Sequence, residues 1–532
     1  MIQATEHVTT HKWWVLVTVC LAVFMGMLDI TIVNVALPEI QKSFSSDFST
    51  LQWVLNAYTL VYAMMLLPVS KLGDRFGKKG VFLMGLVIFI IGSLASGLAP
   101  NDTWLNAARG FQGIGGAAMM SLSLAIVTLA FPDRQRGLAL GIWSSVTGLA
   151  ISIGPLIGGS LVDTLGWRAI FLINLPVGLV AIVMGALFIP KSEPTQKGSL
   201  DPLGMIFSTV MVFSTILALI QKETHASYAW TDRRIVGLFA LALVTLIAFI
   251  VTERIVKAPM IKLSIFRSSS FVGSNIAAFA LGAGIYGGFT YLSILMQNYM
   301  GYSAFQTGLK LLWISVFTLI LGPLTGLVAG KIGNRWLISI ALLLGMGGIL
   351  SIAKLLAVPF TWSDLFIGFI LLGFSNALVN PPISNAAMGA VGLADVGMAS
   401  GVLNVFRQLG ISFGVVILGI SVTNGYNDKL NSGLSRLSQL PPAFSSQTAA
   451  VKGELAHLLH QAGPFAGQQI FTSHQAQVFK QLPIYGQLHR VVFQAFQSGM
   501  VRACLMIAII LGIGVVASIV LIKDNKKAEV VK

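Results

Sequence analysis

Charged side chains are scarce in this chain, and their scarcity excludes a soluble globular protein. Of the 532 residues, 10% are charged and 55% are hydrophobic, whereas a soluble domain carries about 25% charged residues. The formal net charge is +15, but the basic residues lie in short connectors between long apolar runs. We therefore expect a membrane protein that contacts the lipid bilayer, and we expect no nucleic-acid partner.

Cysteine is rarer still, because Cys20 and Cys504 are the only two and each lies within an apolar run. Two isolated cysteines supply neither a disulfide framework nor a metal cluster, so no metal site is expected. The chain also lacks a Gly-x-x-x-x-Gly-Lys-[Ser/Thr] loop for binding nucleotide phosphates. An ATP-driven pump or a membrane enzyme is therefore disfavoured, and no cofactor is expected. The N-terminus has no cleavable signal pattern.

Carboxylates are almost missing from the apolar runs, and Asp29 is the exception. It lies deep inside the run that begins near Trp13. An ionised group at that depth costs about 2.5–3.5 kcal/mol on insertion scales, so it is expected to face a partner or a cavity and to have a function. We expect Asp29 to take up and release protons, with no second acid placed to replace it.

About fourteen apolar runs are long enough to cross a bilayer as helices, for which about 20 residues are needed. They lie at 14–37, 51–72, 80–99, 104–129, 137–162, 168–189, 202–220, 235–252, 270–296, 305–329, 336–358, 363–388, 397–423 and 499–522. Basic residues occupy alternate connectors, which predicts a multi-pass protein of the cell (inner) membrane with both termini in the cytoplasm. The expected fold class is an all-α membrane protein.

The first six and the last six runs resemble each other, which predicts two six-helix bundles. Gly77 aligns with Gly333 at an offset of 256 residues, and Gly154 aligns with Gly414 at an offset of 260. The expected units are an N-terminal bundle at 1–190, two inserted helices with linkers at 191–267, and a C-terminal bundle at 268–532.

Residues 424–498 are expected to form a long polar loop on the outer side, with short amphipathic helices at 449–461 and 473–481. A surface loop, a lid over the outer mouth and a docking site for a partner all fit this segment.

A connector between the second and third runs carries the first motif. Its members are Gly73, Asp74, Arg75, Gly77, Lys78 and Lys79. Glycine permits a sharp turn, Asp74 suits a helix N-terminus, and the basic residues suit anionic headgroups. Such a cluster can form when the inner side is closed and break when it opens. We therefore favour a gate over a loop that only fixes topology.

The fourth run contains Arg109, whose permanent charge also needs a partner inside a membrane. Gln112 and several glycines lie close to it in sequence, so the surrounding face is small and partly polar. Snorkelling to the nearby helix end is the alternative. We expect Arg109 to take part in proton coupling, and we hypothesise that it pairs with Asp29.

The fifth run carries small residues at close intervals. Its candidate residues are Gly141, Gly154, Pro155, Gly158 and Gly159. Small residues four positions apart let another helix approach closely, and Pro155 removes a backbone hydrogen bond, which kinks a helix. Taken alone, this pattern is ordinary membrane packing.

Together these motifs resemble those of the major facilitator superfamily. The connector at 70–79 is similar to the superfamily signature, 105–116 to a motif whose arginine is implicated in proton transfer, and 141–159 to the antiporter motif. The stretches 28–38, 167–178 and 399–410 look like the 14-helix drug:proton antiporter branch, the QacA/EmrB-like exporters.

This resemblance implies an exporter of amphipathic or hydrophobic drugs and toxins that works by alternating access and is driven by the proton gradient. The implied partners are a small-molecule substrate, protons, and a periplasmic adaptor with an outer-membrane channel.

The sequence departs from cation-exporting relatives at Asn56, where some of them carry an acidic residue, so a preference for divalent cations is not expected. The candidate cavity residues are Asn34, Asn56, Tyr58, Gln112, Arg407 and Gln408. For Arg407, helix packing and contact with substrate or proton both stay open. Two other functions also stay open: export of one endogenous siderophore, lipid or amino acid, and a membrane receptor or scaffold that transports nothing.

Overall fold

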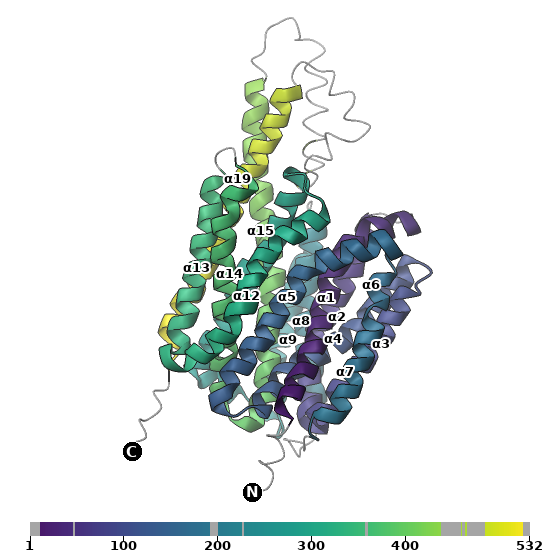
Figure 1. The fold of residues 1–532 in the computed structure, drawn as a ribbon, viewed down its shortest axis with the longest axis vertical. Helices are drawn as coiled ribbons and strands as arrows, with labels where there is room; N and C mark the ends of the chain where they lie inside the picture. Colours follow the sequence, from purple (N-terminus) through teal and green to yellow (C-terminus); the bar gives the residue numbers. More distant parts are fainter. Residues whose placement is uncertain are drawn as a thin grey trace, which may run out of the picture.

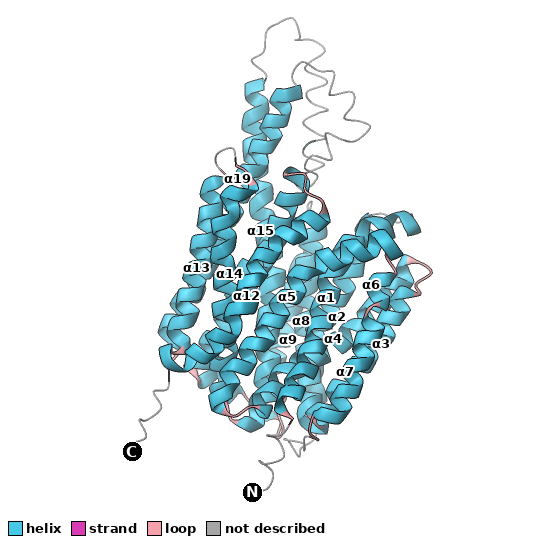
Figure 2. Cartoon of the chain, viewed as in Figure 1, coloured by secondary structure: helices cyan, strands magenta, loops and turns pink. Residues whose placement is uncertain are grey.

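The chain folds into a bundle of long helices. The computed structural model describes residues 11–45, 48–191, 200–225, 228–356, 360–437, 459, 463–464 and 485–524. These residues contain fourteen helices long and apolar enough to cross a membrane and no strand, arranged as shown in Figures 1 and 2. The expected all-α membrane fold is confirmed.

The helices follow the expected order along the chain. The first group is α1 (Lys12–Phe44), α2 (Phe48–Phe76), α3 (Lys78–Gly97), α4 (Asp102–Ala130), α5 (Asp133–Leu165), α6 (Ala169–Leu172) and α7 (Asn174–Phe188). The inserted pair is α8 (Pro202–Thr224) and α9 (Arg233–Ile255). The last group is η1 (Leu263–Arg267), α10 (Ser269–Leu281), η2 (Gly282–Tyr286), α11 (Gly287–Ile294), η3 (Leu295–Tyr299), α12 (Ala304–Ile332), α13 (Asn334–Leu355), α14 (Trp362–Gly389), η4 (Leu393–Asp395), α15 (Val396–Leu437) and α19 (Tyr485–Leu521).

Several helices begin at residues whose side chains satisfy the free backbone N–H groups of the first turn. Asn101 accepts a hydrogen bond from the Trp104 backbone at the start of α4. Ser303 forms a reciprocal capping box with Gln306 at the start of α12. These local signals set where the apolar runs become helical.

Two glycines show the repeat directly in the backbone. Gly77, between α2 and α3, and Gly333, between α12 and α13, both have a φ angle of +94°. Glycine adopts this conformation without the steric cost that a Cβ adds. The sequence offset of 256 residues therefore relates two equivalent turns. The unit boundaries at 190/191 and 267/268 stay predictions.

The expected polar loop at 424–498 is wrong at both of its ends. Helix α15 continues to Leu437, and α19 begins at Tyr485. The two helices pack on each other there through buried Tyr426, Leu430 and Leu488. These apolar residues recur at helical spacing, but the polar residues between them lower the average hydropathy. The helices expected at 449–461 and 473–481 lie outside the described residues, apart from Leu459.

Helix α1 begins and α19 ends at the same end of the molecule, called here the terminal end (Figure 1). The two bundles lie close together there, and their opposite ends diverge in the view of Figure 1. Helix α5 packs along α12, and α2 and α4 pack on α15. The inserted helix α8 packs on both α2 and α15. The inserted pair therefore touches both bundles.

Candidate functional site

Asp29 lies at the centre of a polar network inside the first bundle. Its side chain, on α1, has no exposed surface. Oδ2 accepts a hydrogen bond from Arg109 Nη1 of α4 at 2.5 Å. Oδ1 accepts from Gln112 Nε2 at 3.1 Å and from Asn174 Nδ2 at 2.9 Å. Helices α4 and α7 thus both donate to the carboxylate on α1, and both of its oxygens accept hydrogen bonds.

Arg109 is held on every side by groups of the same bundle. Besides Asp29, its Nη1 donates to Gln112 Oε1 at 2.6 Å and its Nε to the Val54 carbonyl of α2 at 3.2 Å. The guanidinium carbon lies 4.4 Å from the centre of the Tyr58 ring, a distance at which a cation is attracted to an aromatic face. Arg109 is 1% exposed, so it does not snorkel.

Two members of this network were not predicted as site residues. Asn174, at the start of α7, also donates to Ser93 Oγ of α3 at 2.9 Å, and Ser93 donates to the Phe171 carbonyl at 2.9 Å. Asn174 had a signal, because it lies in the 167–178 stretch and is polar within an apolar run. No sequence signal marked Ser93, since serine is common in membrane helices, where its hydroxyl often bonds to the backbone of its own helix.

This arrangement can respond to protonation. A protonated Asp29 loses its charge and one acceptor site, so Arg109 is left without a counter-charge in a buried position. Because Arg109 also holds the Val54 carbonyl, the ionisation of Asp29 bears on the packing of α1, α2 and α4 together. The network is sealed in this structure, with Asp29, Arg109 and Gln112 all buried.

The motif at 73–79 lies at the terminal end, where the two bundles meet. Asp74 Oδ1 pairs with Lys78 Nζ at 2.8 Å, and both side chains are buried. A Cβ on Gly397, in the first turn of α15, would overlap the Asp74 carboxylate. The carboxylate therefore abuts the N-terminus of α15, where the helix dipole favours a negative charge.

Two hydrogen bonds between the bundles reinforce this contact. Ser70 Oγ donates to the Gly397 carbonyl at 2.5 Å, and Ser400 Oγ donates to the Ser121 carbonyl at 2.6 Å. The motif's other basic residues act elsewhere: Lys79 Nζ donates to the Ala186 carbonyl at 2.7 Å, and half-buried Arg75 lies beside Phe76. Gly73 packs against Leu122 of α4.

The connector after α9 joins the two bundles at the same end, a link that was not predicted. Lys71 of α2 donates through Nζ to the Pro259 carbonyl at 2.7 Å. Lys262 pairs with Asp395, just before α15, at 2.7 Å. Glu253, buried in the last turn of α9, accepts from the Ile261 backbone at 3.0 Å. The inserted segment is therefore tied to the terminal end of both bundles.

The small residues of α5 face two different helices. A Cβ on Gly154 would overlap Thr31 of α1, and one on Gly158 would lie 2.7 Å from a side-chain carbon of Ile32. A Cβ on Gly141 would overlap the Gly322 carbonyl of α12. Pro155 packs against Gly308 of α12, and α5 continues as one helix through it.

Gly159 of the same motif is not crowded, since the nearest atom to an added Cβ is 4.0 Å away on Phe305. The other small residues set close contacts of α5 with α1 in its own bundle and with α12 in the other bundle.

The predicted cavity residues do not form one group. Tyr58 and Gln112 belong to the Asp29 network. Asn34 is exposed, and Asn56 and Gln408 are half-buried. Arg407 is buried in the second bundle and is considered below. In the described part of the chain, no group of three or more His, Cys, Asp or Glu side chains is placed to hold a metal ion.

Comparisons with known proteins agree on one family. The family model described as the Major Facilitator Superfamily matches residues 19–415. The chain is 34% identical over 405 residues to the multidrug resistance protein Stp of Mycobacterium tuberculosis, covering 76% of this chain and 74% of that protein.

Other relatives have similar names and coverage. The chain is 32% identical to the multidrug transporter protein MdtP of Bacillus subtilis, over 96% of this chain and 93% of that protein. It is 29% identical to a tetracenomycin C resistance and export protein of Streptomyces glaucescens, over 83% and 81%. Among solved structures, the proton:xylose symporter XylE matches with a TM-score of 0.54 and 16% identity, over 85% of this chain and 95% of that one, and this shows the shared fold.

Proposed function

Because this chain belongs to the major facilitator superfamily of membrane transporters, we propose that it is a proton-coupled exporter of amphipathic or hydrophobic drugs and toxins. The observation that carries the proposal is the buried ion pair of Asp29 with Arg109. Curated relatives named for multidrug resistance, and for tetracenomycin C resistance and export, support the substrate class and the direction.

In the proposed cycle, Asp29 is the proton-binding group. Its protonation removes the charge that holds Arg109, so Arg109 and the Val54 carbonyl are released from their present geometry. Thr31, two residues after Asp29, packs on Gly154 of α5. Helix α5 packs on α12 of the other bundle. A structural change at Asp29 can therefore be transmitted through Thr31 and α5 to the contact of α5 with α12.

We propose further that the terminal end faces the cytoplasm, as the basic connectors predict. The structure then corresponds to a state closed toward the cytoplasm, with Ser70, Asp74 and Ser400 on the closing contacts. Opening this end requires the breaking of those contacts. Rocking of the bundles then carries the substrate outward in exchange for protons.

The driving force is sufficient for concentrative export. One proton moving inward gains about 2.3 kcal/mol per 100 mV of membrane potential, before any pH gradient is added. Since 1.4 kcal/mol is a factor of ten in concentration, one proton per substrate supports a gradient of roughly fiftyfold at 100 mV.

The test uses everted membrane vesicles in which a proton gradient is imposed. Uptake of tetracenomycin C, methylenomycin A and a panel of amphipathic dyes is measured for the wild type and for Asp29→Asn. Asp428→Asn is the matched control, because Asp428 is an exposed carboxylate paired with Arg502 at 2.7 Å.

We expect Asp29→Asn to abolish gradient-driven uptake and Asp428→Asn to leave it unchanged. Uptake by Asp29→Asn at the wild-type rate would refute the coupling role. Failure of the wild type to move any compound of the panel would refute the multidrug proposal. A periplasmic adaptor with an outer-membrane channel stays a prediction, which co-purification from crosslinked cells tests.

A further inference from the structure

Arg407, on α15 of the second bundle, is a buried cation for which the described residues supply no counter-charge. It is 6% exposed. Its only hydrogen bond within the described structure runs from Nη1 to Asn404 Oδ1, one turn earlier, at 3.3 Å. Nε and Nη2 have no hydrogen-bond partner there. Within the described structure, four of the five N–H donors of this guanidinium are therefore unused.

No carboxylate of the second bundle is available to Arg407 among the described residues. Each of the four described carboxylates there already has a partner away from Arg407. Asp364 belongs to the capping box of α14, Asp395 pairs with Lys262, Asp428 pairs with Arg502, and Asp524 accepts from the Arg335 backbone. The contrast with Arg109, which is fully neutralised by Asp29, is direct.

The groups around Arg407 come from both bundles and are polar or aromatic. Tyr62, on α2, and Tyr286, in η2, lie within electrostatic range of the guanidinium. Tyr286 is fixed by two amides: its hydroxyl donates to Asn376 Oδ1 at 3.2 Å and accepts from Asn380 Nδ2 at 2.8 Å. Tyr62 thus approaches from the first bundle, and Asn404 and the fixed Tyr286 from the second.

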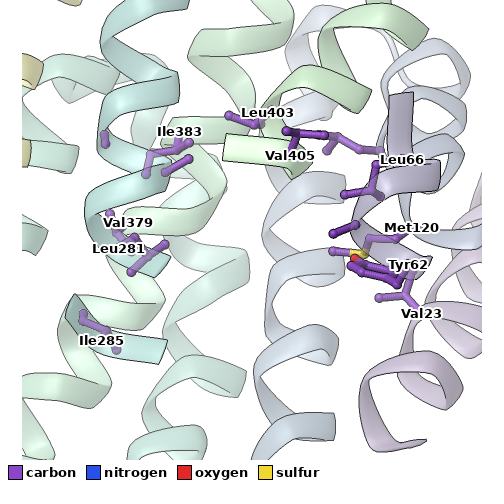
Figure 3. Close-up of a cluster of buried hydrophobic side chains, with 14 of the residues drawn as sticks. Val23, Tyr62, Leu66, Met120, Leu281, Ile285, Val379, Ile383, Leu403 and Val405 are labelled. Atoms are coloured by element: carbon purple, nitrogen blue, oxygen red, sulfur yellow. The ribbon is translucent and has the colours of Figure 1, made fainter. Parts of the chain in front are cut away.

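The backbone around this point is also unusual. Tyr286 ends a π-helical turn, Gly282–Tyr286, and a Cβ on Gly282 would overlap the Arg407 carbonyl. Such turns are rare and occur frequently at functional sites. Figure 3 shows that Leu403 and Val405, which precede Arg407, lie between Leu66 of α2 and Ile383 of α14. Arg407 therefore follows the apolar part of α15 that lies between the two bundles.

We infer that Arg407 binds the anionic group of the substrate, so that this protein exports amphipathic organic anions. A buried guanidinium cannot neutralise itself by losing its proton, and leaving it unpaired is costly. A carboxylate matches its free N–H donors in a bidentate geometry. This inference rests on the proposed export function, because that function identifies the bound anion as a substrate.

The test compares an anion with a neutral analogue of the same shape. Binding of 1-naphthaleneacetate and of 1-naphthaleneacetamide is measured by titration calorimetry. The full chain is kept in nanodiscs of zwitterionic lipid, in a zwitterionic buffer without added salt. We expect the wild type to bind the anion at least tenfold more tightly. Arg407→Gln should lower the affinity for the anion at least tenfold and change the affinity for the amide less than twofold.

Two variants accompany this test. Arg407→Lys should keep part of the preference for the anion, because it keeps the charge but not the planar fork. Lys310→Gln removes a positive charge elsewhere in the same bundle, where Lys310 lies over the Tyr302 and Trp362 rings, and should change neither affinity.

Thermal unfolding without ligand separates a binding role from a packing role. Removal of an unpaired buried cation should leave the unfolding temperature of Arg407→Gln equal to or above that of the wild type. A helix-packing role for Arg407 predicts a lower temperature and equal losses for both ligands, and that result would overturn the inference.

Equal wild-type affinities for anion and amide would also overturn it. Loss of the preference when sodium chloride is added at physiological concentration would overturn it too, since the site would then hold an inorganic anion only. Binding is measured without a proton gradient, so the outcome is independent of transport. Anion binding by a protein that transports nothing would keep this site and refute export, whereas export without a preference for anions would refute this inference alone.

Discussion

The Asp29–Arg109 pair makes a prediction that a double-mutant cycle can test. Asp29 uses Oδ2 for Arg109 and Oδ1 for Gln112 and Asn174. In Asp29→Asn one of these oxygens becomes an NH2 group, which cannot accept a hydrogen bond. Because the site is fully buried, the remaining guanidinium loses its counter-charge without gaining water.

Breaking a buried pair from one side costs about 3–5 kcal/mol. For a cooperative unit of 150–250 residues, the size of the first bundle, each kcal/mol shifts the unfolding temperature by about 2–4 °C. Asp29→Asn and Arg109→Gln should therefore each lower this temperature by about 6–20 °C. The double variant should be less destabilised than the sum of the two by about 2–3 kcal/mol.

The assay is thermal unfolding in nanodiscs at neutral pH, followed by tryptophan fluorescence. The control cycle uses Asp428→Asn and Arg502→Gln, a pair of the same kind at 2.7 Å whose side chains are 64% and 47% exposed. An exposed pair contributes about 0–1 kcal/mol, so this cycle should be nearly additive. If the buried cycle were equally additive, the two residues would not be coupled, and the proton-switch argument would lose its basis.

The motifs make two further predictions. Gly154→Ala should slow export and destabilise the protein by about 1–3 kcal/mol, because its Cβ overlaps Thr31 and overpacking is costly. Gly159→Ala has room for its Cβ and should be neutral in the same uptake and unfolding assays; equal effects of the two would contradict the packing argument. Asp74→Asn should loosen the terminal end, because a charge near a helix N-terminus is worth about 0.3–1 kcal/mol. Maleimide should therefore label Ser400→Cys in everted vesicles several-fold faster in the Asp74→Asn background, and an unchanged rate would show that Asp74 does not hold this end closed.

The sequence predicted the membrane fold well, because the signal is a local property of each segment. An apolar run of spanning length has to become a helix in lipid, whatever its neighbours are. The same reasoning singled out Asp29 and Arg109, since the cost of a charge depends first on its depth in the membrane. The prediction failed at 424–437 and 485–498, where the buried residues of α15 and α19 are diluted by polar ones.

The partners of these residues could not be read from the sequence in the same way. Asn174 and Ser93 reach the site from α7 and α3. The third hydrogen-bond acceptor of Arg109 is the backbone carbonyl of Val54, and a backbone carbonyl leaves no pattern in the sequence. The closing contacts at Gly397 and Ser121 likewise involve carbonyl oxygens, which every residue has.

Two arginines show what the sequence determines and what only the tertiary structure decides. Both Arg109 and Arg407 stand in apolar runs, and the sequence by itself determined that each of them needs a partner, because a guanidinium stays charged at any depth. Only the tertiary structure decided that Arg109 meets Asp29 while Arg407 meets no carboxylate of the described chain. The cost of burying a charge is a property of one residue and its depth, whereas its compensation depends on which helices pack against it.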